Sequence, residues 1–378
     1  MVYTLLACVK FSALPLLFLL TMPLRAQPLV SPDVHADGRV TFRLRAPQAR
    51  EVLLQCEGVP DAPMQRDAQG VWSATTAPLD PDIYDYSFRV DGLRAIDPAN
   101  PFIQYNLLDL GSLVHVPGPA DLPWEINAVP HGVIHRHLYR SAVIGRERPF
   151  LVYTPPGYDP AAAKPYPVLY LLHGYSDAED AWTTVGRANV ILDNLIARGQ
   201  AKPMVVVMPL GYGNDEVLAA GWSKARTPQV KHDSDRKFGD ALLNEVMPQA
   251  EKAYRVSPDR AAHAIAGLSM GGRQSLVIGL NALDRFAWIS AFSSGEVDSA
   301  FASIYPAVGV NTNARLRLLW ISCGRDDGLL QFNQNLADWL DAQGVRHTWV
   351  VTPGAHSWLV WRRNLATLVP LLFQDHQP

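Results

Sequence analysis

Ser269 stands at the centre of a Gly-x-Ser-x-Gly segment, residues 267–271, between an apolar run and a run compatible with a helix. Such a segment is typical of a nucleophile elbow, in which a serine occupies a sharp strand-to-helix turn and its hydroxyl is exposed above a sheet. The small residues Gly267 and Gly271 allow the strand and the helix to approach closely. The helix N-terminus directs amide N–H groups at this point, which favours a developing negative charge. The segment therefore predicts a nucleophilic serine.

An acid and a histidine follow Ser269 in the order expected for a triad built on such an elbow. One predicted strand leads into Asp326 and Asp327, and a later one leads into a loop that carries His356. An imidazole in that place can take the serine proton and return it to a leaving alcohol, while a carboxylate holds the imidazole tautomer. The residues alone leave Asp326 and Asp327 as alternatives for the acid.

Two backbone amides are predicted to form an oxyanion hole beside the serine. An early apolar strand ends in His173, Gly174 and Tyr175, and a turn of this kind supplies one amide, that of Tyr175. The residue after the nucleophile, Met270, supplies the other. We expect His173 to be structural and to hold the turn by side-chain hydrogen bonds, because the base belongs after the acid in the chain.

The chain from residue 131 to about 373 resembles the esterase family that contains bacterial feruloyl and acetylxylan esterases, carbohydrate esterase family 1. The Gly-x-x-Asp pattern of that family implies that the acid is Asp327 rather than Asp326. Enterochelin esterases, S-formylglutathione hydrolase and mycolyl transferases belong to the same superfamily, so the resemblance defines the chemistry better than the substrate. The matching stretches are residues 166–182, 186–209, 264–272, 322–329 and 353–365.

Alternating strands and helices are predicted around these motifs. The pattern indicates a doubly wound, mostly parallel sheet with its site at the carboxyl ends of the strands, which is the α/β-hydrolase architecture. Strands are expected at residues 150–154, 168–172, 204–209, 262–266, 288–292, 318–322 and 348–351, and helices at 189–198, 238–254, 271–283 and 333–343.

Tryptophans are candidates for substrate contact at the mouth of the site, which should draw on the loops at 211–231 and 293–313. The candidates are Trp222, Trp182 and Trp358. Trp222 is favoured because it lies in a long glycine-rich loop rather than in a regular element. For Trp358, packing beneath the histidine loop is at least as good an interpretation.

An all-β module is predicted ahead of the catalytic part. Its short strands are separated by turn residues and no helical period appears, which suggests a small β-sandwich. The module resembles the early-set immunoglobulin-like domain, similar to carbohydrate-binding module family 48. Trp72, Tyr84 and Tyr86 could stack on sugars, but core packing is the favoured interpretation, so we expect the module to dock on the catalytic part and to shape its entrance. Its strands are expected at residues 40–45, 51–55, 71–75 and 84–90.

The chain divides into four predicted segments. Residues 1–26 are interpreted as a secretory signal peptide, because an apolar run follows Lys10 and a plausible cleavage site ends at Ala26. The run is too short for a membrane span, and a retained anchor is the alternative. We therefore expect a secreted or periplasmic protein. The other segments are an immunoglobulin-like sandwich (27–116), a proline-rich linker (117–130) and an α/β-hydrolase domain (131–378).

Composition and charge disfavour several classes of partner. The formal net charge is only −3, and Lys and Arg are scattered rather than gathered in a basic patch suited to nucleic acid. Cys56 and Cys323 belong to different segments, so a disulfide is not expected, and neither has neighbours at metal-ligand spacing. The stretch from His232 to Asp235 is interpreted as a solvated loop. We expect no cofactor, no metal, and no nucleic-acid or membrane partner after removal of the signal.

The sequence thus predicts an exported serine esterase that releases hydroxycinnamoyl or acetyl groups from acylated plant polysaccharide such as xylan, or from its oligosaccharides. A siderophore esterase is the main alternative among enzymes, and Lys224, Arg226 and Lys231 leave it open. The alternative outside the enzymes is a catalytically dead glycan-binding protein, which the intact set of triad residues disfavours.

Overall fold

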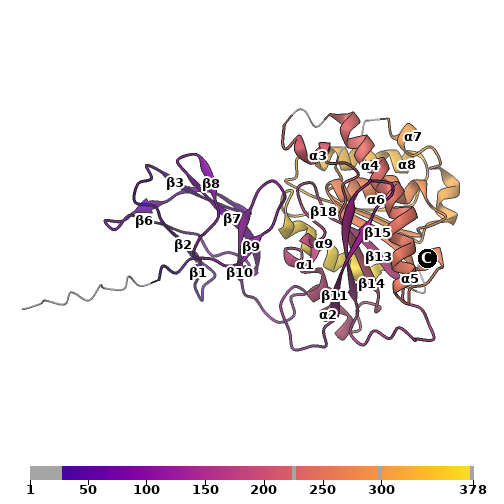
Figure 1. Ribbon diagram of the computed structural model, residues 1–378, viewed down its shortest axis with the longest axis horizontal. Coiled ribbons are helices and arrows are strands. Elements are labelled where there is room, and N and C mark those ends of the chain that lie inside the picture. Colours follow the sequence, from indigo (N-terminus) through magenta and orange to yellow (C-terminus); the bar gives the residue numbers. More distant parts are fainter. Residues whose placement is uncertain (1–27, 224–226, 296–299, 375–378) are drawn as a thin grey trace, which may run out of the picture.

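The computed structural model describes residues 28–223, 227–295 and 300–374 (Figure 1). The predicted signal peptide, residues 1–26, lies outside the described residues. Three β-sheets organise these described residues: two small ones before residue 117, which we call the N-terminal module, and one of eight strands in the C-terminal part. Among the described residues, no helix combines the length and the apolar character needed to cross a membrane.

The N-terminal module is a sandwich of two sheets. Its strands are β1 (Asp33–Val34), β2 (Val40–Arg45), β3 (Val52–Cys56), β4 (Val59–Pro63), β5 (Gln65–Arg66), β6 (Val71–Thr75), β7 (Asp82–Val90), β8 (Leu93–Ala95), β9 (Ile103–Gln104) and β10 (Gly111–Val116). One sheet has the order β1-β2-β6-β5 and the other β4-β3-β7-β10-β9, with β8 paired to β7. Side chains of both sheets meet in one core, and Trp72, Tyr84 and Tyr86 are buried there. Packing therefore accounts for these three aromatic residues, as expected.

The C-terminal part is built on a mostly parallel sheet. Its strands are β11 (Val133–Arg140), β12 (Glu147–Thr154), β13 (Val168–Leu172), β14 (Val205–Pro209), β15 (His263–Leu268), β16 (Trp288–Phe292), β17 (Leu318–Gly324) and β18 (Thr348–Thr352). The order is β11-β12-β14-β13-β15-β16-β17-β18, in which β12 is antiparallel to both of its neighbours and all other pairs are parallel. The carboxyl ends of β13, β15, β17 and β18 therefore meet at one edge, where polar loops can converge.

Helices cover both faces of this sheet (Figure 1). They are α1 (Ala181–Thr184), α2 (Ala188–Ala197), α3 (Glu216–Ala219), α4 (Pro228–Ala241), α5 (Met247–Ala253), α6 (Met270–Asn281), α7 (Phe301–Ile304), α8 (Leu330–Ala342) and α9 (Trp358–Leu368), with a π-helical turn at Leu242–Val246 and 3₁₀ turns at Arg260–Ala262, Val310–Ala314 and Val369–Leu371. Helices α1, α2 and α9 share one core with Leu169 and Leu171 of β13. Helices α4, α5, α6 and α8 share the other with Tyr170 and Leu172, because successive residues of a strand face opposite sides.

Helix α4 begins ten residues before the predicted helix at 238–254. Thr227 caps it by accepting a hydrogen bond from the Val230 amide, and Pro228 at the first helical position has a φ suited to a helix start. The stretch from His232 to Asp235 therefore lies on a helix, and its interpretation as a loop is wrong. Strand β11 was not predicted, because its exposed residues alternate with half-buried ones and form no apolar run.

Residues 117–130, expected as a linker between domains, are packed against α2. Trp124 is buried in the core that α2 and α9 share. Asn194 of α2 and Arg198 after it each donate two hydrogen bonds of 2.8 Å to backbone carbonyls of this segment. The segment is therefore a fixed spacer on the surface of the C-terminal part.

Candidate active site

Ser269 occupies a strained turn between β15 and α6. Its backbone has a φ of 51° and a ψ of −113°, a region that residues other than glycine rarely adopt and that is found at functional sites. Close packing around the turn requires glycine. A Cβ on Gly271 would lie 2.5 Å from the carbonyl oxygen of His173, and one on Gly267 would lie 2.5 Å from that of Gly271. The serine is thus held at the carboxyl edge of the sheet, where the elbow was predicted.

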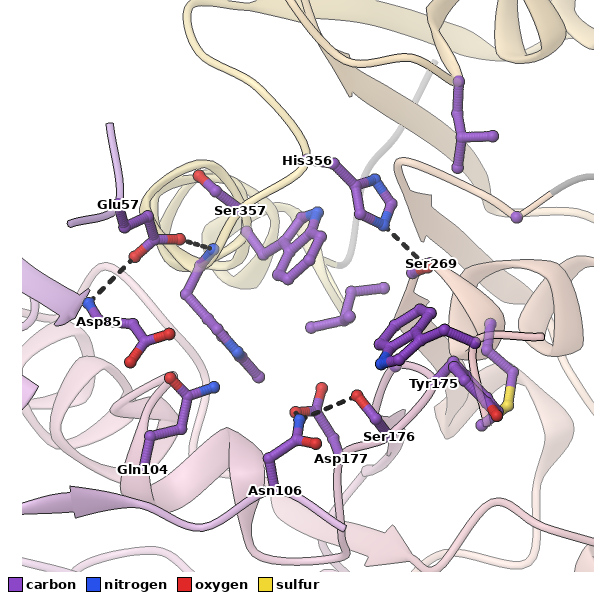
Figure 2. A pocket seen from close by; sticks show the side chains of 18 of the residues that line it. Glu57, Asp85, Gln104, Asn106, Tyr175, Ser176, Asp177, Ser269, His356 and Ser357 are labelled. Carbon is purple, nitrogen blue, oxygen red and sulfur yellow. Dashed lines mark hydrogen bonds between the residues drawn. The ribbon is translucent and has the colours of Figure 1, made fainter. Parts of the chain in front are cut away.

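His356 lies between Ser269 and Asp327 and contacts both. Its Nε2 is 2.9 Å from the Ser269 Oγ (Figure 2), and its Nδ1 is 2.8 Å from a carboxylate oxygen of Asp327. An ionised carboxylate only accepts hydrogen bonds, so Nδ1 donates to Asp327 and Nε2 is left to accept from the serine hydroxyl. This is the arrangement in which an imidazole acts as a general base toward a serine.

Asp327 is held in the loop after β17 and is almost completely buried. The Leu329 amide donates a hydrogen bond of 2.8 Å to its second oxygen. Burial raises the pKa of this carboxyl, but the hydrogen bonds that it accepts, first from His356 and also from the Leu329 amide, outweigh that effect and hold the pKa below its ordinary value. The alternative acid, Asp326, is exposed to solvent. The structure therefore brings Asp327, and not Asp326, to the histidine.

The two residues predicted to supply oxyanion-hole amides both lie near the serine. Met270 is the first residue of α6, so its amide belongs to the helix N-terminus, where the first N–H groups have no partner within the helix. Tyr175 follows Gly174, at which a Cβ would lie 3.7 Å from the Ser269 Cβ. Both residues line the same cavity as the serine.

His173 fastens the turn that carries Tyr175. Its Nδ1 donates to the Gly174 carbonyl and its Nε2 accepts from the Gly211 amide, both at 2.8 Å. Burial lowers the pKa of His173 to about 4, so the ring is neutral at neutral pH and can fill both roles. The Tyr175 hydroxyl bonds to two backbone carbonyls of the segment after β14, at 2.8 and 2.7 Å. The turn is therefore fixed at both ends before any substrate arrives.

Comparison with known proteins identifies the family of the chain. A family model described as Esterase matches residues 141–372, which include Ser269, Asp327 and His356. This chain belongs to that esterase family. It is a carboxylic ester hydrolase, so the non-catalytic alternative is not retained.

Two curated relatives carry esterase names. The endo-1,4-β-xylanase/feruloyl esterase of Xylanibacter ruminicola is 29% identical over 351 residues, which cover 91% of this chain and 46% of that protein. The acetyl esterase of Caldicellulosiruptor saccharolyticus is 23% identical over 235 residues, which cover 52% of this chain and 80% of that protein. This esterase thus spans less than half the length of the first of these relatives.

Solved structures share the fold of this esterase. The CE1 ferulic acid esterase of Anaeromyces mucronatus, solved with ferulic acid, is 26% identical with a TM-score of 0.58, over 68% of this chain and 96% of that one. The enterobactin esterase of Shigella flexneri has a TM-score of 0.66 over 88% of this chain and 92% of that one, but at 21% identity the likeness shows the fold alone. The predicted α/β-hydrolase fold and the resemblance to carbohydrate esterase family 1 are confirmed.

A cavity of about 670 Å³ opens beside the triad of this esterase and is lined by both parts of the chain. One side of it, which we call the polar wall, consists of Asp85, Gln104 and Asn106 from the N-terminal module and Asp177 from the loop after β13 (Figure 2). Asn106 joins the two parts, because its amide donates to the Asp177 carboxylate at 3.2 Å. No local pattern in the sequence marks these residues, since only the packing of the two parts brings them to the serine.

Burial changes the protonation of the carboxyls around the cavity. It raises the pKa of Asp85 to about 7, with a contribution from the neighbouring Glu57 charge, and it raises the pKa of Asp177 to about 7. Burial also raises the pKa of Glu57. Near neutral pH the polar wall therefore holds carboxyls in both protonation states, which together donate and accept hydrogen bonds.

Trp222 and Trp358 both line the cavity, in different ways. Trp222 is 62% exposed, its ring lies edge-on to Tyr175 with 5.0 Å between centroids, and its indole N–H donates to Asp109 at 2.7 Å. Trp358 is buried and packs edge-on against Trp361, which in turn lies 4.8 Å from the His356 ring. The structure thus places Trp222 at the entrance and Trp358 beneath the histidine.

Trp182 does not reach the cavity, so its expected contact with substrate is wrong. The side chain is completely buried, and its indole N–H donates to the Leu172 carbonyl at 2.9 Å. Its ring packs edge-on against Phe292 and Trp358. Trp182 therefore belongs to the core that supports the site from below.

The basic residues near the site give weak support for an anionic ligand. Among the described residues, the cavity is lined by Arg94, Lys231 and Arg273. Arg94 and Arg273 are paired with carboxylates at 3.6 and 2.7 Å. Lys224 and Arg226 lie outside the described residues.

One of the two described cysteines, Cys56, lines the cavity. Cys56 and Cys323 are buried free thiols. Within residues 28–223, 227–295 and 300–374, no group of three or more His, Cys, Asp or Glu side chains is placed so that it could hold a metal ion.

Proposed function

We propose that this esterase releases hydroxycinnamoyl groups such as ferulate, or acetyl groups, from plant cell-wall polysaccharide such as xylan, after export to the periplasm or the medium. The observation that carries the proposal is a triad that opens into a cavity with aromatic side chains near the serine and a polar wall opposite them. The names of the xylanase/feruloyl esterase relative and of the structure solved with ferulic acid support the choice of ester.

Hydrolysis follows from the geometry in two steps. The Ser269 Oγ attacks the ester carbonyl carbon while His356 Nε2 takes its proton. The charge that develops on the carbonyl oxygen is stabilised by the amides of Met270 and Tyr175. When the bond to the alcohol breaks, His356 returns the proton to the departing oxygen and the acyl group remains on Ser269. Water, deprotonated by His356, then attacks the acyl carbon and regenerates Ser269, while Asp327 stays ionised throughout.

The two sides of the cavity suit the two halves of such an ester. Trp222 lines the cavity with a largely exposed aromatic ring, on which a flat acyl group can stack. The carboxyls and amides of the polar wall can donate to and accept from the hydroxyl groups of a sugar. The cavity therefore favours an aromatic acid esterified to a neutral, hydroxyl-rich alcohol.

A siderophore ester is the second candidate, because the enterobactin esterase likeness extends over most of the chain, including the N-terminal module. An iron–catechol chelate is strongly anionic. Glu57, Asp85 and Asp177 all line the cavity, and the fraction of these carboxyls that is ionised near neutral pH repels an anionic ligand. The charge of the cavity therefore favours the sugar ester over the chelate.

A panel of esters tests the proposal: methyl ferulate, methyl acetate, acetylated xylan, feruloylated arabinoxylan fragments and enterobactin. We expect the highest kcat/KM for the feruloyl esters. Ser269→Ala and His356→Ala should each lower it by about 10⁴-fold or more, and the double variant should lose little beyond that, because the two residues act as a unit. Faster hydrolysis of enterobactin than of any feruloyl ester would overturn the substrate assignment. Activity confined to the cytoplasmic fraction of the native host would overturn the assignment of export.

A further inference from the structure

Helix α9 begins two residues after His356, so its first turn fixes the backbone that carries the imidazole. Only Ser357 separates the histidine from Trp358, the first helical residue. The first amides of a helix have no partner within the helix and need acceptors from elsewhere. Ser357 stands at the N-cap position, but its side chain makes no capping hydrogen bond. The cap of α9 therefore comes from another part of the molecule.

A carboxylate of the N-terminal module supplies this cap. One oxygen of Glu57 accepts a hydrogen bond of 2.7 Å from the Trp358 amide, across 301 positions of sequence (Figure 2). A negative charge in this place is also favoured by the helix dipole. Glu57 is held in turn by β7, since its amide donates to the Asp85 carbonyl at 2.8 Å and its other oxygen accepts from the Asp85 amide at 3.4 Å.

The module fastens the same helix again one turn further along. Arg362 is completely buried and donates to the Asp82 carboxylate. Arg363 donates to the other Asp82 oxygen at 2.8 Å. Between these two anchors, Leu359 packs against the hydrophobic core of the module. The first two turns of α9 are therefore positioned by residues that precede them by about three-quarters of the chain.

We infer that Glu57 is a positioning residue for ester hydrolysis, which holds α9 and the His356 loop so that Nε2 faces the Ser269 hydroxyl. The inference rests on the proposed roles of Ser269 and His356. Their contact of 2.9 Å depends on the place of the loop, and a displacement of about 1 Å is enough to slow a reaction by about two orders of magnitude. This role is separate from contact with substrate. It should therefore affect the hydrolysis even of an ester that is too small to reach the polar wall.

Three variants separate the cap from other roles of the carboxylate. Glu57→Ala removes the acceptor, whereas Glu57→Gln keeps an oxygen that can accept from the Trp358 amide. Glu51→Ala is the matched control, because Glu51 is an exposed carboxylate of the same module. With p-nitrophenyl acetate, we expect kcat of Glu57→Ala to fall by about 10- to 100-fold with KM within about twofold of wild type. The kcat of Glu57→Gln should stay within about threefold of the wild-type value, and the kcat of Glu51→Ala should equal the wild-type value.

Hydrogen–deuterium exchange supplies a readout that does not depend on turnover. The amides of residues 357–361 should exchange faster in Glu57→Ala than in Glu57→Gln or wild type, while exchange in the eight-stranded sheet stays unchanged. A folded Glu57→Ala protein with wild-type exchange and wild-type kcat overturns the inference, as does an equal loss in Glu57→Ala and Glu57→Gln. A wild-type protein that hydrolyses none of the esters overturns the proposed function itself. A wild type that works through Ser269 but is insensitive to Glu57→Ala overturns this inference alone.

Discussion

The carboxylate of Asp82 and the guanidinium of Arg362 form an ion pair between the two parts of the chain, and both side chains are completely buried. Asp82 also pairs with Arg363 at 2.8 Å, so one residue of β7 binds two consecutive arginines of α9. The second nitrogen of Arg362 donates to the Val185 carbonyl at 2.8 Å. A charge this deeply buried is tolerated only because all of these partners are present.

Removing Asp82 should therefore destabilise the whole molecule. Asp82→Ala leaves Arg362 buried without its counterion, and we expect the free energy of unfolding to fall by about 3–5 kcal/mol. Denaturant unfolding followed by tryptophan fluorescence measures the loss. Asp80→Ala, which alters an exposed carboxylate two residues earlier, is the control and should change stability by less than about 0.5 kcal/mol. A loss in Asp82→Ala no larger than that of the control would show that the buried pair does not hold the two parts together.

The choice between two neighbouring acids can be tested directly. Asp327→Asn replaces the acceptor of the His356 Nδ1–H and favours the wrong tautomer, so turnover should fall by about 10³- to 10⁴-fold. Asp326→Asn should lose less than about threefold, because that side chain is exposed and the hydrogen bond to His356 belongs to Asp327. Steady-state kinetics on methyl ferulate measures both. The reverse order of losses would contradict the placement of the acid.

The raised pKa of Asp177 predicts a specific dependence of stability on pH. Its pKa of about 7 in the folded protein lies above the ordinary value of 3.8, so folding favours the protonated form. The stability that this group contributes is fully present below its ordinary pKa and is lost as the pH rises through about 7. Asp177→Asn removes the titration while keeping an oxygen that can accept from Asn106.

The gain in stability of Asp177→Asn over wild type should therefore be larger by about 1–3 kcal/mol at about pH 8 than at about pH 5. Denaturant unfolding at the two pH values measures the difference. Asp121→Asn, at an exposed site, is the control and should show the same difference from wild type at both. If the stability gained by Asp177→Asn became smaller as the pH rises, the prediction would be refuted.

Trp222 should set part of the preference for aromatic acyl groups. Trp222→Ala removes an aromatic face of the cavity, so we expect the ratio of kcat/KM for methyl ferulate to that for methyl acetate to fall about tenfold. Hydrolysis of the acetate should change by less than about twofold, because acetyl is too small to need this wall. Phe102→Ala, at a 70% exposed aromatic residue outside the cavity lining, is the control. An unchanged ratio in Trp222→Ala would exclude stacking on this ring.

The local architecture around the triad was predictable, because each of its residues follows a strand of one parallel sheet. The carboxyl ends of β15, β17 and β18 meet at the same edge, so the chain order and the strand pattern suffice to bring Ser269, Asp327 and His356 together. Choosing Asp327 over Asp326 needed the family pattern, since neighbouring residues in a loop differ in direction and not in chemistry.

Helix α9 was not predictable from its own residues. Arg362 and Arg363 interrupt the apolar pattern that marks a buried helix face. Arg362 is buried only because Asp82, 280 positions earlier, accepts from it. The same is true of the polar wall, whose residues have no local signature and become functional neighbours through packing between the two parts. The predicted contact of Trp182 with substrate was wrong because this residue lies on α1 and completes a core that the local sequence does not mark.

The shared helix α9 sets a limit on how this enzyme can be recombined. Its first turns are capped and neutralised by the N-terminal module, and residues 117–130 are bound to α2 rather than free to swing. In a chimera that exchanged the module at residue 116, helix α9 would lose the Glu57 cap beside His356, and Arg362 would lose its counterion Asp82. The β-sandwich and the hydrolase therefore have to be exchanged together, because replacement of the module alone would remove contacts that position the catalytic histidine.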